Sequence, residues 1–416
     1  MLSSLANAWK IPELRKKILF TLMMFVIFRI GCHIPVPGID KELLSTMFQS
    51  DIFGWIDIIS GGSFKNLTIF AMGIIPYINA SIIVQLLTMV MPYFQRLQRE
   101  GQEGRKKMAM WIRYGAVVLG AAQAIVMAFY LRSAMVNPNA FSVIVCIITL
   151  TAGTAFLMWI GEQITENGIG NGISLIIFAG IVSRLPSAIS SMYEYVSTGS
   201  VSIIVVILFV IAALFLVAAV VAVQEAQRRI TVQYSKRVIG RKVYGGQSTH
   251  IPMKINQAGV IPIIFAMALL TFPTVIAGFF SGPVAVWVQN AFSYRSVLYI
   301  VLYAILIFLF SYFYTAATFN TADVADNMRK NGGFIPGLRP GKPTAEYLDK
   351  VLSRLTFSGA TFLTLIALLP SICMALTKMN LYFGGTSLLI AVGVALDTMK
   401  QLESQLLMRH YQGFMK

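Results

Sequence analysis

The chain has 416 residues, of which 57% are hydrophobic and only 12% are charged, and its mean hydropathy is +0.73. Since a soluble globular protein carries roughly 25% charged residues, this composition excludes an ordinary soluble domain and predicts that most of the chain lies in lipid. The net charge of +16 could indicate a nucleic-acid partner, but the basic residues are concentrated in loops between apolar spans, so their meaning depends on the topology.

A helix needs about 20 apolar residues to cross the roughly 30 Å hydrocarbon core of a bilayer. The first candidate span follows Lys16 and Lys17 and could imitate a signal peptide, but residues 28–38 offer no small-residue cleavage site, so we expect a helix of the mature protein. In chain order, the predicted transmembrane helices are 18–36, 69–92, 114–132, 143–162, 173–193, 201–223, 257–280, 296–318, 357–377 and 382–400.

The distribution of basic residues orients these spans. If the N-terminus, the even-numbered connections and the C-terminus lie on one side of the membrane, that side holds most of the 33 Lys and Arg residues. We therefore expect that side, with both chain ends, to be cytoplasmic. The opposite side holds few basic residues: Lys41, Lys65, Arg132, Arg184, Arg295 and Lys378.

Three cytoplasmic connections, 94–113, 224–256 and 319–354, are longer than joining two helices requires. In the second, RITVQY (229–234) alternates apolar and polar residues, which predicts a short strand or hairpin. Tips rich in Gly and Pro would present Arg241 and Arg339 on restricted turns. We expect these loops to bind a large partner; a solvated basic loop that only maintains topology is the alternative.

Residues 51–92 depart from a plain apolar span, because a Gly pair, Lys65 and Asn66 precede the apolar run. A charged residue at the bilayer centre costs roughly 2.5–3.5 kcal/mol, so Lys65 is not expected to face lipid. We expect a segment near 55–70 to fold partway into a protein-lined space and to lead into a span from Gly73. An external loop with an interfacial helix is the alternative.

Within that span, Ile74 and Ile78 are four residues apart and share one helix face. Pro76 between them bends the helix or ends its first turn. Asn79 and Gln85 need polar partners in hydrocarbon, from another helix or an aqueous path.

A second irregular region joins the fourth and fifth spans, where GIGNG (168–172) predicts a tight cytoplasmic turn before Ile173. Its glycines supply positive φ angles and close backbone approach. The run does not match G-x-G-x-x-G and no strand precedes it, so nucleotide binding is not expected.

The sequence lacks the usual motifs of catalysis and metal binding. Cys32, Cys146 and Cys373 lie far apart in apolar runs, and the three histidines form no metal-ligand pattern. Neither G-x-S-x-G nor a P-loop occurs, so we expect no enzyme and no cofactor. Apart from Arg29 near the first span, no charged residue is expected at mid-membrane depth, which disfavours an ion-coupled transporter. A pathway would be lined by aliphatic side chains, which suits a seal that opens for something large.

Five runs of the sequence resemble the SecY family, the central subunits of bacterial protein-conducting channels, in the family's order and over nearly the whole chain. The resemblance implies an all-α polytopic membrane protein with ten transmembrane helices in two inverted five-helix halves, 1–195 and 196–416, forming a clamshell around an hourglass pore. The runs are GGSFKNLTIFAMGIIPYINASIIVQLLT (61–88), LMWIGEQITENGIGNGISLIIFAGI (157–181), RVIGRKVYGGQSTHIPMKINQAGVIPIIFA (237–266), FIPGLRPGKPTAEYLDKV (334–351) and YFGGTSLLIAVGVALD (382–397).

The resemblance also implies roles for individual positions. Arg241 and Arg339 would contact cytoplasmic partners. An apolar constriction ring, whose β-branched side chains are stiff enough to form a gasket, would consist of Ile74, Ile78, Ile173, Ile177, Ile264 and Ile390. The plug would consist of Ile59, Ser60, Gly61, Gly62, Ser63, Phe64, Lys65 and Asn66. The lateral gate, between the second and third and the seventh and eighth spans, would carry Asn79, Ile82, Gln123 and Phe272.

The implied function is that of a channel subunit in the bacterial cytoplasmic membrane, which passes unfolded preproteins across the membrane and releases transmembrane segments sideways into lipid. A signal peptide would enter lipid through the gate, since each buried CH₂ contributes roughly 0.8 kcal/mol. The driving force would come from the SecA ATPase or a translating ribosome, and SecE and SecG would be the accessory subunits. An ion-coupled secondary transporter of a small solute is the alternative function.

Overall fold

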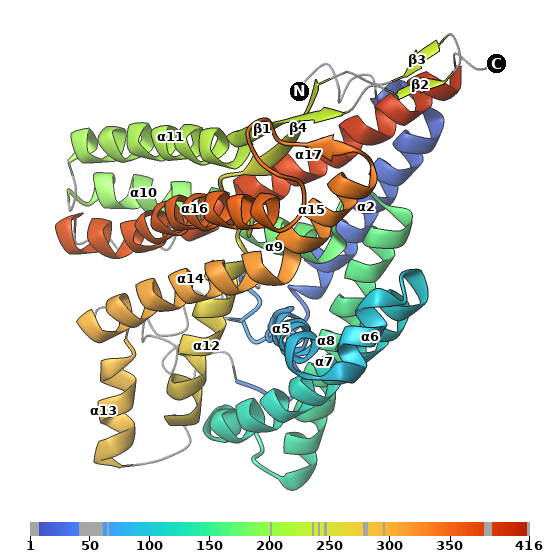
Figure 1. Ribbon diagram of the computed structural model, residues 1–416. Helices are drawn as coiled ribbons and strands as arrows, with labels where there is room; N and C mark the ends of the chain where they lie inside the picture. The colour runs from blue at the N-terminus through green and yellow to red at the C-terminus, as the bar shows by residue number, and fades with distance from the viewer. Residues whose placement is uncertain are drawn as a thin grey trace.

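The computed structural model describes residues 8–40, 61–64, 66–199, 202–234, 237–239, 242–244, 248–277, 282–293, 296–377 and 385–413. In these ranges the chain is mainly helical, and its strands lie between α11 and α16 in the sequence (Figure 1). The helices of the N-terminal part are α2 (Pro12–Gly31), α5 (Ile75–Val90), α6 (Pro92–Arg99), α7 (Gln102–Tyr130), the 3-10 helix η2 (Leu131–Ala134), α8 (Ala140–Asn167), α9 (Gly172–Val182) and α10 (Leu185–Ser197).

The C-terminal part contains the remaining helices and all the strands. Its helices are α11 (Ile203–Glu225), α12 (Ile261–Ala277), α13 (Pro283–Ala291), α14 (Val297–Thr318), α15 (Thr321–Lys330), α16 (Lys342–Thr377) and α17 (Gly385–Gly413). Its strands are β1 (Gln227–Tyr234), β2 (Arg237–Ile239), β3 (Lys242–Tyr244), β4 (Ser248–Lys254) and β5 (Gly333–Phe334).

A helix coincides with each of the ten predicted spans, namely α2, α5, α7, α8, α9, α11, α12, α14, α16 and α17. Among the described residues, six helical stretches are long and apolar enough to cross a membrane. A seventh arises if α5 and α6, bent by 98°, count as one span. Pro92 begins α6 and accounts for this break, because proline cannot continue the hydrogen bonding of α5. The predicted helical membrane fold is therefore confirmed, while the count of ten crossings stays a prediction.

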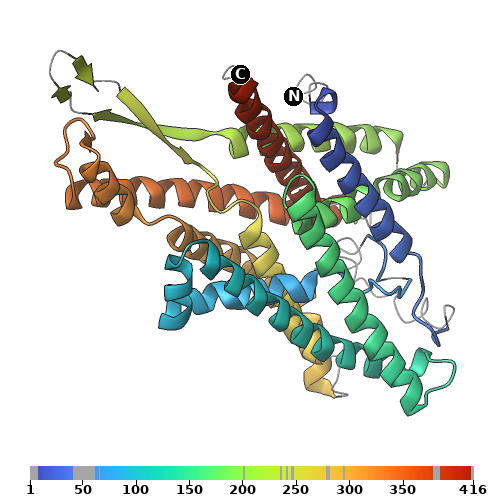
Figure 2. The same cartoon turned by 90° about the vertical axis from the view of Figure 1, so that its right-hand side faces the viewer.

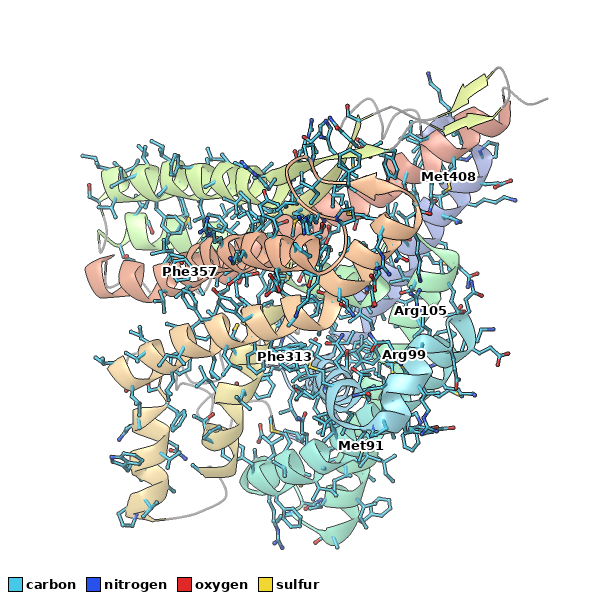
Figure 3. All side chains as sticks on the ribbon, viewed as in Figure 1. Met91, Arg99, Arg105, Phe313, Phe357 and Met408 are labelled. Carbon is cyan, nitrogen blue, oxygen red and sulfur yellow. The ribbon has the colours of Figure 1, made fainter. Side chains whose placement is uncertain are left out.

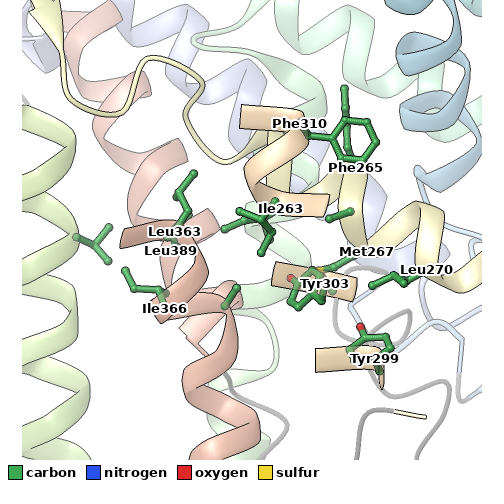
Figure 4. Packing of buried hydrophobic residues seen from close by; sticks show 14 of the residues in the cluster. Ile263, Phe265, Met267, Leu270, Tyr299, Tyr303, Phe310, Leu363, Ile366 and Leu389 are labelled. Atoms are coloured by element: carbon green, nitrogen blue, oxygen red, sulfur yellow. The ribbon is translucent and has the colours of Figure 1, made fainter. Parts of the chain in front are cut away.

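The helices pack in two groups that follow the chain order. In the first group α5, α7 and α8 are neighbours, and α2 and α9 pack on α8. In the second group α14 packs between α12 and α16, and α17 contacts α11 and α16. Figure 4 shows the core of this second group, where Ile263 and Phe265 of α12 meet Phe310 of α14, Leu363 of α16 and Leu389 of α17.

Between the two groups, the described residues meet mainly where α5 contacts α12 and where α9 contacts α17. The packing within each group is more extensive than the packing between them. A seam therefore runs through the molecule along α5 and α12.

The predicted strand at 229–234 is confirmed as β1, which pairs antiparallel with β4, Ile230 lying opposite Ile251. The same strand pairs with β5 at Gln233 and Phe334. Ile230 and Val232 point into a small core with side chains from β4, α15 and α16. The strands β1, β4 and β5 thus form one packed unit with α15 and the start of α16. From this unit the strands lead away from the helices (Figure 2).

The start of α2 and the end of α17 lie side by side at one end of the molecule in both views (Figures 1 and 2). Ala8 and Leu14, at the start of the described chain, pack with Ile169 of the GIGNG turn and Leu402 of α17. We name these four residues the basal cluster. The two ends of the described chain therefore lie on the same side of the molecule.

Candidate functional site

The six isoleucines predicted to form a ring come together in one apolar cluster, here called the constriction cluster. Both helix groups contribute to it: α5, α8 and α9 with α2 from the first, α12 and α17 from the second. Ile74, Ile177 and Ile390 are at most 5% exposed. The other members of the predicted ring, Ile78, Ile173 and Ile264, pack against this cluster and are partly buried.

The first isoleucine pair is positioned by an irregular segment before α5. Residues 66–74 run as turns, and α5 begins at Ile75 with Pro76 in its first turn. The backbone N–H of Ile78 donates to the carbonyl oxygen of Ile74 over 3.1 Å, which sets the two side chains one turn apart. The predicted start at Gly73 is thus two residues early, because Gly73 has a φ of +57° and lies outside the helix.

Two glycines allow this irregular segment to lie deep in the helix packing. A Cβ on Gly153 of α8 would lie 1.8 Å from the carbonyl oxygen of Ile69, and one on Gly31 of α2 would lie 2.0 Å from the ring of Phe70. Phe70 stacks between Phe28 and Phe156. The non-helical backbone is therefore enclosed by protein, as irregular backbone at membrane depth requires. The signal in the sequence is a glycine inside each of these two apolar spans.

The second isoleucine pair is positioned by the GIGNG turn. The side chain of Asn171 accepts hydrogen bonds from the backbone N–H groups of Ile173 and Ser174, which caps α9. A Cβ on Gly161 of α8 would lie 2.6 Å from Ile173 Cδ1, so this glycine makes room for the isoleucine. The backbone N–H of Ile169 donates to Thr21 Oγ1 of α2. The predicted turn is confirmed, and it is packed against α2.

The predicted gate residues are distributed over α5, α7 and α12, and the described contacts place one of them at the seam. Ile82 of α5 packs against the core of the second helix group, so it reaches across to the other side. Asn79 is buried in α5, and Gln123 is partly buried in α7. Phe272 belongs to α12, but its side chain lies outside the described residues.

Only part of the predicted plug is described. Ile59, Ser60 and Lys65 lie outside the described residues. Gly61 and Gly62 have φ angles of +67° and +91° and begin a turn in which Ser63 and Phe64 are buried. Asn66 follows this turn and is exposed.

An ion pair that sequence reasoning missed joins α7 to α8. Arg113 Nε donates to Glu162 Oε1 over 2.5 Å, and the Glu162 side chain is only 20% exposed. The available signal was a pair of opposite charges at the cytoplasmic ends of two consecutive predicted spans.

Of the two predicted partner-binding residues, Arg241 lies outside the described residues. Arg339 is exposed on the turn that follows β5. Its carbonyl oxygen accepts a hydrogen bond from the buried hydroxyl of Thr344 over 2.8 Å, which fixes the turn to α16. Arg99 and Arg105, in the connection 94–113, also lie on the surface (Figure 3).

The fold is similar to solved structures of protein channels. One structure, described as that of a protein conducting channel, matches with a TM-score of 0.65 at 20% identity, over 96% of each chain. Canine Sec61 in a ribosome–channel complex matches with a TM-score of 0.61 at 18% identity, also over 96% of each chain. At these identities the likeness concerns the fold.

Proteins found by sequence share a higher identity with this chain than the solved structures do. The protein translocase subunit SecY of Halalkalibacterium halodurans is 46% identical over 430 residues, covering all of both chains. The subunit of the same name from Thermotoga maritima is 45% identical, covering all of this chain and 98% of the relative. None of these proteins supports the alternative of a small-solute transporter. Since the family model for SecY also matches residues 68–399, the chain belongs to the SecY family.

Proposed function

We propose that this chain forms the pore of a protein-conducting channel, through which unfolded preproteins cross the membrane. The observation that carries this proposal is the constriction cluster, because helices from both groups contribute isoleucines to a single apolar contact. A purely apolar constriction resists ions by dewetting. It can also surround side chains of any chemistry, since it offers no fixed hydrogen-bond partner.

The seam between α5 and α12 is the proposed lateral gate. Its contact is short compared with the packing of α5 along α7. Small residues let α5 and α7 approach closely, a Cβ on Gly115 lying 3.3 Å from Ala80 Cβ. The two halves, 1–195 and 196–416, therefore separate at α5 and α12 while α5 stays with α7, and an apolar segment passes between them into lipid.

The plug is the proposed seal beside the constriction. Support comes from the Gly61–Phe64 turn, which is packed among the helices of the first group. A structurally similar protein is described as a SecY whose plug domain stabilises the closed state and maintains a membrane seal.

The packed unit of β1, β4, β5, α15 and α16 is the proposed docking surface for cytoplasmic partners. Arg339 presents a guanidinium there, which suits carboxylates and phosphates. The structural relatives that were solved on ribosomes support a ribosome as one partner. SecA as the motor, and SecE and SecG as accessory subunits, complete the proposal. The chain resides in the bacterial cytoplasmic membrane, with both ends in the cytoplasm.

Disulfide trapping tests the proposed route. Cys32, Cys146 and Cys373 are replaced by alanine, and one cysteine is placed at Ile78→Cys and another in a stalled preprotein. We expect a cross-link that depends on SecA and ATP, because Ile78 packs against the constriction cluster.

The matched control is Ile83→Cys on the same helix, whose side chain is 45% exposed on another face of α5. It should give little cross-link. If Ile83→Cys reacts and Ile78→Cys does not, the ring assignment is wrong. If the reconstituted complex moves no preprotein, the proposed function itself is wrong.

A further inference from the structure

The last turn of α2 carries a charge in an otherwise apolar stretch. After Lys17 the helix has no charged residue until Arg29, which is partly buried. Its neighbour Phe28 belongs to the constriction cluster. A guanidinium within an apolar stretch requires hydrogen-bond acceptors from the protein. The acceptors of Arg29 therefore identify the segments that it connects.

Arg29 joins two segments that are far apart in the sequence. Its Nη1 donates to the carbonyl oxygen of Gly61 over 2.9 Å and to Ser183 Oγ over 3.2 Å. The Ser183 hydroxyl in turn donates to the carbonyl oxygen of Gly180 over 2.8 Å. One guanidinium thus links α2, the Gly61–Phe64 turn and the C-terminal end of α9.

The contact between the turn and α9 is backbone against backbone. A Cβ on Gly61 would lie 3.1 Å from Gly180 Cα and 3.3 Å from Ser183 Oγ. Gly180 follows Ile177 by three residues and Ile173 by seven, so it lies on the helix face of both isoleucines. The turn therefore rests on that face of α9, about one turn beyond the constriction.

We propose that Arg29 is a positioning residue for the channel's seal: it ties the Gly61–Phe64 turn to the face of α9 that carries Ile173 and Ile177. This inference rests on the proposed function. When the turn is displaced, the guanidinium loses the Gly61 carbonyl and the tie breaks. A hydrogen bond from a charged donor is roughly twice as strong as a neutral one. Removing the guanidinium should therefore favour the displaced turn by roughly tenfold.

A cross-link measures the position of the turn directly. A Cβ on Gly61 would lie 3.3 Å from Ser183 Oγ, so the pair Gly61→Cys and Ser183→Cys brings two sulfur atoms close together when the turn rests on α9. The carbonyl oxygen of Gly61 remains as an acceptor for Arg29 in this pair. In a background with the three native cysteines replaced, we compare the oxidation rate of this pair with Arg29 present and with Arg29→Met. We expect the rate to fall several-fold with Arg29→Met. The matched control is Arg132→Met, which changes an exposed arginine of η2, outside α2, α9 and the Gly61–Phe64 turn, and should leave the rate unchanged.

Ion leak measures the consequence in the complete complex with its accessory subunits, reconstituted in liposomes without SecA or preprotein. Arg29→Met should raise the leak roughly tenfold, Arg29→Lys should raise it less, and Arg132→Met should leave it unchanged. Oxidising the cysteine pair in the Arg29→Met variant should lower the leak again, and reduction should restore it. A residue that only supported folding would reduce the amount of intact complex and show no such reversal.

Equal oxidation rates with and without Arg29 would overturn the inference, as would a leak in Arg29→Met no higher than in Arg132→Met. Failure of the unmodified complex to translocate a preprotein would overturn the proposed function instead. The cross-link comparison needs no preprotein, so it tests Arg29 separately.

Discussion

Isoleucine suits the constriction because its branched Cβ leaves few χ1 rotamers. A ring of such side chains keeps its shape, whereas longer flexible side chains would repack around a hydrophilic segment. Burying an isoleucine contributes about 1.5–3 kcal/mol. Ile74, Ile177 and Ile390 are almost fully buried, so in the proposed function a signal peptide or a motor has to offset the cost of parting them.

Replacing Ile390 with Asn should weaken the seal. A buried amide without a hydrogen-bond partner costs about 1–3 kcal/mol. Water in the open pore removes this cost, so the substitution lowers the free energy of the open state relative to the closed state. We expect a higher resting conductance in planar bilayers and translocation of preproteins with defective signal peptides. Ile390→Leu, which stays apolar, is the control; equal conductance of the two variants would mean that Ile390 serves packing alone.

Replacing Arg339 with Glu should stop partner-driven translocation without unfolding the protein. Arg339 is exposed, and its turn is held by the Thr344 hydroxyl rather than by its own side chain. The matched control is Arg132→Glu, an exposed arginine of η2 that lies outside the proposed docking surface and undergoes the same change in charge. We expect SecA-dependent transport to be lost only in Arg339→Glu, while both variants insert normally. Normal transport by Arg339→Glu would remove this residue from the mechanism.

At the scale of elements, glycines decide how irregular segments fit between helices. The turns at 66–74 and at 168–171 each carry an isoleucine pair into the constriction cluster. Each lies against a glycine of α8, Gly153 for the first and Gly161 for the second. A side chain at either position would occupy space already filled by backbone or by Ile173.

Gly153→Ala should therefore lower the free energy of unfolding by about 1–3 kcal/mol, the usual cost of overpacking. The added Cβ would meet a backbone oxygen, which cannot move aside as a side chain can. Gly120→Ala in α7 is the control, because its nearest contact would be 3.6 Å. Thermal unfolding of the purified complex should show a lower Tm for Gly153→Ala only. Equal Tm values would mean that the segment at Ile69 shifts freely.

At the scale of the molecule, the two helix groups are joined on one side by the basal cluster and by α9 with α17. On the other side they meet along α5 and α12. This arrangement predicts that the basal cluster stays closed while the seam opens, so that weakening the cluster affects stability before it affects gating.

Leu402→Ala tests the basal cluster. Leu402 is 3% exposed, and truncating a buried leucine costs about 2–5 kcal/mol. The control Leu407→Ala removes a side chain of the same helix that is 65% exposed. Protease digestion of the solubilised complex should separate the two halves faster in Leu402→Ala. Equal digestion would show that the α9–α17 contact alone holds this side together.

The sequence by itself determined the membrane character of the chain, the positions of its helices and the strand at 229–234. These features follow from composition and local periodicity, which depend on residues close together in the chain. The recurrence of Ile74 with Ile78, and of Ile173 with Ile177, likewise follows from helical spacing.

Only the tertiary structure decided which of these surfaces meet. Helix packing across long stretches of sequence brings Ile264 and Ile390 to both isoleucine pairs. It also brings Arg29 to Gly61 and Ser183, and Arg113 to Glu162. The glycines show the reason. Gly153 and Gly161 are unremarkable inside an apolar span, and they become decisive only when another segment lies against them.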